Sequence, residues 1–159
     1  MQKLRAVLAA STVGVAALAG TVAASPTASA ATSTSLCGST YKYVGKHAMT
    51  KVSGKEGPRT GGYVYVYYSA KTKKNCAISK PVPELRGKSW GLGVGLHSPT
   101  YKDGDSDGYA RGQVYTRWAG PVYVKSPRSC ITVTGDMNTG TPGHLRAHYE
   151  VTKKGVHCG

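Results

Sequence analysis

The sequence predicts an all-β fold: a small, disulfide-stapled β-sandwich or barrel of seven to eight short antiparallel strands. Short runs rich in valine and tyrosine recur along the chain, separated by clusters of Gly, Pro, Asn, Asp and Ser. After the first 30 residues no segment has a convincing amphipathic helical period. Four cysteines and no phenylalanine indicate a domain that relies on disulfides and tyrosines to hold its core.

Residues 1–30 are predicted to be a secretory signal peptide. Lys3 and Arg5 form a basic start, residues 7–24 are mostly apolar, and Ala28-Ser29-Ala30 is a small-x-small cleavage site. A membrane anchor is the alternative, but no charged stop-transfer flank follows that site. We therefore expect a secreted, extracellular protein with a flexible segment over residues 31–36 and a single β domain over residues 37–159.

The four cysteines predict two disulfides, because an even count in a small secreted domain is typical of a disulfide framework. Three pairings are open. We favour Cys37–Cys76 and Cys130–Cys158, since each bond then closes one half of the chain. A zinc site is disfavoured because no two cysteines are close enough for a Cys-x-x-Cys clip.

Two similar segments predict two hairpins. Gly62–Val66 leads through a polar turn to Cys76, and Gly120–Val124 leads to Cys130. The residues after each cysteine are predicted to be return strands. Further predictions are strands at 41–44, 109–118 and 143–151, a mobile basic loop at 45–61, and a period-two strand at 90–96 whose alternate positions are bare glycines. Such a glycine face allows close approach of another part of the protein or of a ligand.

The chain is strongly basic, with 21 Lys and Arg against 7 Asp and Glu and a formal net charge of +14. Removing the leader, with Lys3 and Arg5, lowers the charge to +12. Such a surface favours anionic cell-wall or spore-envelope polymers, although solubility alone is an alternative. Lys71, Lys73 and Lys74 are the predicted basic binding patch, at a hairpin tip beside tyrosines. Secretion argues against nucleic acid, and we expect a monomer without stable membrane insertion.

Asp103, Asp105 and Asp107 have the spacing of the first half of a calcium loop, with Gly108 after the third carboxylate. The second half fails, because the position of the bidentate glutamate is Val114. The alternative is an Asp/Gly-rich turn between strands. Calcium is the only cofactor that the sequence suggests.

No catalytic set is visible, so a non-enzymatic protein is predicted. The chain lacks a Gly-x-Ser-x-Gly nucleophile motif, and its carboxylates show no spacing that selects a catalytic pair. His144 and His148 are four residues apart, which on a strand is about 13 Å and too far for one metal ion. They are predicted to belong to a solvent-facing polar stripe with Arg146 and Glu150.

Several short blocks resemble the small secreted actinobacterial proteins called spore-associated protein A. They are Cys37–Tyr41, Tyr67-Tyr68, Lys74–Cys76, Ala119–Val124 and Gly155–Cys158. The resemblance implies secretion, disulfides and association with the spore or hyphal surface, and it implies no known activity. The chain departs from that pattern at Ile131–Val133, which lacks an expected tryptophan, and at the acidic run Asp103–Asp107.

Two functions are therefore expected as alternatives. The first is a secreted non-enzymatic protein that is held to the spore or cell surface by its charge. The second is a secreted inhibitor or toxin-like effector of a hydrolase, displayed on the loops at 45–61 and 98–108, since rigid scaffolds often carry function on loops.

Overall fold

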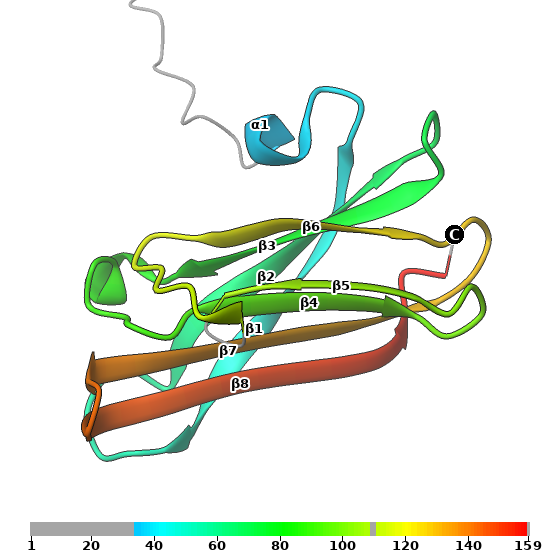
Figure 1. Ribbon diagram of the computed structural model, residues 1–159. Coiled ribbons are helices and arrows are strands. Elements are labelled where there is room, and N and C mark those ends of the chain that lie inside the picture. The colour runs from blue at the N-terminus through cyan, green and yellow to red at the C-terminus, as the bar shows by residue number, and fades with distance from the viewer. Residues whose placement is uncertain (1–33, 109–110, 159) are drawn as a thin grey trace, which may run out of the picture.

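The computed structural model describes residues 34–108 and 111–158, and the predicted signal peptide lies outside these residues. Eight strands form one antiparallel sheet in the order β5-β4-β7-β8-β1-β2-β3-β6, which curls into a nearly closed barrel (Figure 1). The all-β prediction is confirmed, and the barrel is the form it takes. No helix in the described part of the chain is long and apolar enough to cross a membrane.

The strands follow one another with short connections and little helix. Their bounds are β1 Lys42–Ser53, β2 Thr60–Ser69, β3 Lys74–Pro81, β4 Gly93–Ser98, β5 Asp103–Asp107, β6 Ala119–Lys125, β7 Ile131–Thr141 and β8 His144–Val156. A short helix, α1 (Thr34–Cys37), precedes β1 in a segment predicted to be flexible, and a 3-10 turn, η1 (Pro83–Leu85), follows β3.

The core fills the barrel interior. It is built from the inward-pointing residues, which occupy about every second position along each strand. On β2, Val64 and Val66 are fully buried, and Met49 of β1 and Met137 of β7 pack into the same cluster. The remaining members are mostly valine, leucine and isoleucine. This alternation follows from the period of two along a strand.

A second, smaller cluster lies on the outer face of β2 and β3. Tyr67, Ile78 and Cys76 are buried there beneath residues 34–41, which include α1 and Tyr41 (Figure 1). Tyr63, Tyr65 and Tyr67 of β2 point away from the barrel interior, as the alternation predicts. Large aromatic rings thus build a second buried layer in a chain that has few large aliphatic residues.

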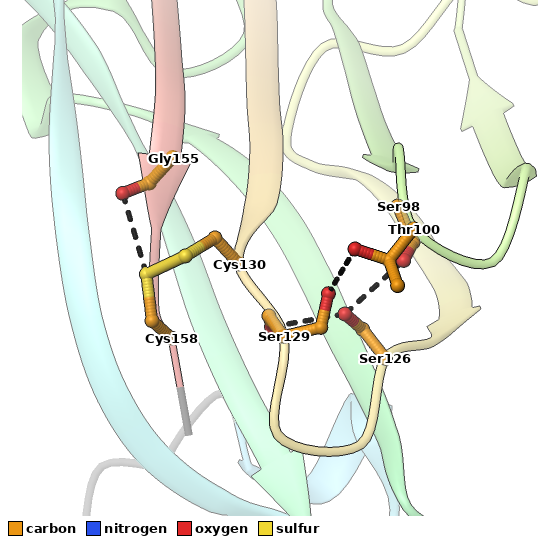
Figure 2. The surroundings of a disulfide bond; sticks show 7 residues. All are labelled: Ser98, Thr100, Ser126, Ser129, Cys130, Gly155 and Cys158. Carbon is orange, nitrogen blue, oxygen red and sulfur yellow. Dashed lines mark hydrogen bonds between the residues drawn. A yellow bond between two sulfur atoms is a disulfide. The ribbon is translucent and has the colours of Figure 1, made fainter.

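Both disulfides form as predicted. Cys37–Cys76 ties the N-terminal segment to β3 inside the second cluster. Cys130–Cys158 joins the start of β7 to the residues that follow β8 (Figure 2). Two disulfides are compatible with an extracellular location.

The bare glycine face before and along β4 is covered by polar side chains of β7. A Cβ atom at Gly93 would collide with the carboxylate of Asp136, and one at Gly95 would collide with the hydroxyl of Thr134. The glycines therefore make room for a neighbouring strand's side chains, which is the intramolecular outcome that the sequence allowed.

Two strand predictions were wrong. β1 continues to Ser53 because residues 42–50 pair with β2, so the loop predicted at 45–61 shrinks to residues 54–59. Of the strand predicted at 109–118, residues 109–110 lie outside the described residues and residues 111–118 form no strand, with Val114 and Trp118 exposed at 61% and 43%. The amides of Arg111 and Gln113 instead donate to the carbonyl of Gly108, which closes a turn.

Only the first predicted hairpin exists. β2 pairs with β3 in continuous register from Gly62 to Ser69, as predicted. β6 pairs with β3 and not with β7, while β7 pairs with β4 and β8. The second segment is therefore a sheet edge, and its similarity to the first reflects shared strand composition rather than shared pairing.

Candidate functional site

Three turns meet at the end of the barrel that also carries the C-terminus. They are the β2–β3 turn (residues 70–73), the β4–β5 turn (99–102) and the β6–β7 connection (126–130). The Ser126 amide donates to the Lys73 carbonyl at 3.3 Å, and the Tyr101 hydroxyl donates to the Pro127 carbonyl at 3.0 Å. The Ser129 hydroxyl bonds Thr100 at 2.7 Å (Figure 2). These bonds hold the three turns against one another.

Six basic side chains gather on these turns and on the strand ends beside them. We call this group the basic end: Lys71, Lys73, Lys74, Lys102, Lys125 and Arg128. Lys74 and Lys125 lie directly opposite each other on β3 and β6, which is an unfavourable like-charge pair. Within residues 34–108 and 111–158, none of the six forms an ion pair.

The basic end also contains unusual backbone geometry. Among the described residues four non-glycine residues have positive φ: Lys73 (55°), Lys102 (50°), Arg128 (52°) and His157 (51°). All four lie at this end of the barrel. Each such residue costs roughly 1–2 kcal/mol relative to an ordinary conformation, and glycine would avoid that cost. Strain of this kind concentrates at functional sites.

A groove runs between the turns of the basic end. Its volume is about 470 Å³, and Lys73, Arg128, Tyr68 and Tyr101 are among the residues that line it. Tyr101 is 43% exposed, so much of its side chain is open to solvent. The groove thus combines two positive charges with two aromatic rings, and its remaining lining is small or polar.

The three aspartates predicted as calcium ligands instead join the two edges of the sheet. The Lys125 amide donates to Asp103 Oδ2 at 2.7 Å, the Tyr123 amide to Asp105 Oδ2 at 2.9 Å, and the Gly120 amide to Asp107 Oδ2 at 2.8 Å. We call these carboxylates the aspartate row. Their period of two places them on one face of β5, where they replace a backbone ladder to β6.

The aspartate row keeps its third hydrogen bond to β6 although the residue expected to donate it is a proline. Pro121 would face the row two residues before Tyr123, but proline has no amide hydrogen, and Gly120 donates instead. Arg111 Nη2 lies 3.6 Å from Asp105 Oδ1. Since the described chain contains no group of three His, Cys, Asp or Glu side chains arranged to hold a metal ion, calcium stays a prediction that this geometry does not favour.

A second polar group lies on the outer face of β7 and β8. His148 contacts Asn138 Oδ1 at 2.5 Å through Nδ1 and Glu150 Oε1 at 2.6 Å through Nε2. Asp136 lies directly opposite Glu150 across the two strands. Alternation along β8 therefore places His148 and Glu150 outward, as predicted.

Asp136 makes this group sensitive to pH. Burial raises the pKa of its carboxyl above the ordinary 3.8, while His148 opposes the rise and Glu150 adds to it. The folded protein then holds this proton more tightly than the unfolded chain, so stability falls as pH rises from 3.8 through the folded pKa. We expect Asp136→Asn to be more stable than the wild type at pH 7 and to lose that advantage below pH 3.8. Urea unfolding across this range measures the difference, and a gap independent of pH would contradict it.

No family model, curated protein or solved structure matches this chain. The candidate site therefore stands on its geometry. Sequence reasoning found Lys71, Lys73 and Lys74 because they are adjacent. It missed Lys102, Lys125 and Arg128. Lys125 ends a strand, and the other two follow Ser/Pro/Thr-containing turns that mark a loop without indicating which loops meet.

Proposed function

We propose that this is a secreted, non-enzymatic protein that binds anionic envelope polymers at its basic end. The observation that carries the proposal is the groove of about 470 Å³, lined by Lys73, Arg128, Tyr68 and Tyr101, with further unpaired cations around it. A polymer with regularly spaced negative charges would neutralise the facing pair Lys74 and Lys125, which repel each other in the free protein.

The distribution of acidic residues supports the same proposal. Asp103, Asp105 and Asp107 turn their oxygens towards the amides of β6, and Glu56 pairs with Arg146 at the other end of the barrel. These contacts leave the cations of the basic end without internal partners. A negatively charged partner is therefore attracted by every cation of the basic end.

The tyrosines suggest a polymer with apolar faces between its charges. Tyr101 and Tyr68 line the groove beside the cations. Flat rings pack against the apolar faces of sugars or of a glycerol backbone, and Tyr keeps a hydroxyl for polar contact. Phosphodiester polymers and carboxylated polysaccharides share this chemistry, so the experiment must distinguish them.

The test compares binding of the mature protein to immobilised poly(glycerol phosphate) and to polygalacturonate. The decisive variant is the triple change Lys73→Gly, Lys102→Gly and Arg128→Gly. At positive φ glycine relieves strain, which offsets its cost in chain entropy of about 0.5–1 kcal/mol, so the variant should fold. Three lost charges at about 1 kcal/mol each predict roughly 100-fold weaker binding.

A matched control removes the same charge from the opposite end. Lys55, Arg59 and Lys88 are exposed and lie in or near the β1–β2 loop and η1. Their triple change to alanine should leave binding within about threefold of the wild type. Equal losses of binding in the two triple variants would mean that binding depends on net charge alone and not on the basic end. Binding that is unaffected by salt, or absent for both polymers, would reject it.

A further inference from the structure

Two histidines that lie far apart in the sequence meet near the basic end. His47 of β1 and His157, 110 positions later, are joined by a hydrogen bond between their Nε2 atoms, which lie 2.9 Å apart. Their ring planes are inclined at 64°. Both rings are partly buried, and neither belongs to the main core.

Three features hold His157 in this position. Its ring lies over Gly45, where a Cβ atom would come within 2.8 Å of His157 Cε1. Its backbone adopts the left-handed conformation, with φ of 51°. The next residue, Cys158, is bonded to Cys130 (Figure 2). The chain therefore accepts a bare glycine and a strained residue in order to bring this imidazole to His47.

The space beside the pair is roomy and mostly apolar, with a few polar side chains in its wall. A cavity of about 230 Å³ is lined by His157, Asn75, Tyr68 and Ser126, among others. Asn75 is only 2% exposed, and its Nδ2 has no hydrogen-bond partner within the described structure. A buried amide donor without a partner is costly, and it indicates that a molecule or ion-bound water belongs in this cavity.

We propose that His47 and His157 bind a divalent copper or nickel ion through their Nε2 atoms, with water in the remaining coordination positions. Imidazole nitrogens are good ligands for these ions. Two bonds of about 2.0 Å at a right angle place the nitrogens about 2.8 Å apart, whereas a tetrahedral zinc ion needs about 3.3 Å. The observed 2.9 Å matches the square arrangement. The Asn75 amide is then available to donate to a metal-bound water.

Burial and a neighbouring charge affect both imidazoles of the pair. Burial is the main reason that the pKa values of both imidazoles lie below 6.5, with a further lowering by Lys153 at His47 and by His47 at His157. In the free protein one Nε2 donates its hydrogen to the other, so the donor ring must carry its hydrogen on Nδ1 before both Nε2 lone pairs can bind a metal ion. Lys153 opposes a bound cation, so we expect moderate affinity.

The test is a titration of the mature protein with Cu²⁺ at pH 7, followed by calorimetry and by electron paramagnetic resonance. The expected result is one ion per chain, with a tetragonal signal that shows coupling to two nitrogens. His47→Asn should weaken binding about 10- to 100-fold or more, because it removes a direct ligand. His97→Asn is the matched control, since His97 is exposed and lies on β4, and it should bind as the wild type does.

Gly45→Ala separates the metal site from folding. The added methyl group displaces the His157 ring while both histidines remain, so binding should weaken although the circular dichroism spectrum is unchanged. Cu²⁺ binding that survives in the double variant His47→Asn and His157→Asn would overturn the proposal. A signal with one nitrogen ligand, or stoichiometry that falls equally in His97→Asn, would overturn it as well.

Discussion

Replacing Asp107 with alanine is expected to lower the free energy of unfolding by about 3 kcal/mol. Its carboxylate accepts three hydrogen bonds: from the Gly120 amide, the Gly108 amide and the Tyr115 hydroxyl. The first joins the two edges of the sheet, and the other two fix the turn after β5. Alanine leaves these donors without partners, and a hydrogen bond to a charged group contributes about 1.5–3 kcal/mol. Urea unfolding of the two proteins at pH 7 measures the loss.

Asp103→Ala is the matched comparison within the aspartate row. Asp103 accepts one hydrogen bond, from the Lys125 amide, at the more exposed end of β5. Its loss should cost about 1 kcal/mol. Equal losses at the two positions would mean that the row acts through net charge rather than through its contacts with β6. A rise in the melting temperature of the wild type on adding Ca²⁺ would indicate that the aspartate row binds calcium.

The aspartate row shows what sequence reasoning can and cannot supply. The period of two at Asp103, Asp105 and Asp107 was visible, and it does place three carboxylates on one face. The partner of that face was not visible, because β6 follows after a segment that forms no strand. Alternating carboxylates suit both a calcium ion and a row of amides, so local spacing alone cannot choose between them.

Long-range strand pairing limited the prediction of the rest of the fold in the same way. The β2–β3 hairpin has a short turn, so its pairing is local and was predicted. β6 pairs with β3 across an interval that holds β4 and β5, and no local signal encodes that choice. The two disulfides were predicted because four cysteines allow only three pairings, and in the favoured one each bond closes one half of the chain. His47 and His157 had no such restriction, and only the closed barrel brings them together.

The second large effect is expected from the Cys37–Cys76 disulfide. Changing both cysteines to alanine should lower the free energy of unfolding by roughly 3.5–4 kcal/mol on the chain-entropy model. The bond spans 39 positions, and Cys76 is fully buried against Tyr67 and Ile78 in the second cluster. Without it, residues 34–41 lose their covalent link to β3, and the outer face of β2 becomes open to water.

The matched change at the other disulfide should destabilise the protein less and act on a different site. Cys130–Cys158 spans 28 positions, and Cys158 is exposed, so its replacement by alanine removes little packing beyond the roughly 3.5 kcal/mol of chain entropy. It also releases His157, so Cu²⁺ binding should weaken here and persist in the Cys37/Cys76 variant. Unfolding measurements combined with copper titration of both double variants test this division. Copper binding that weakened equally in both would contradict the assignment of His157 to the Cys130–Cys158 end.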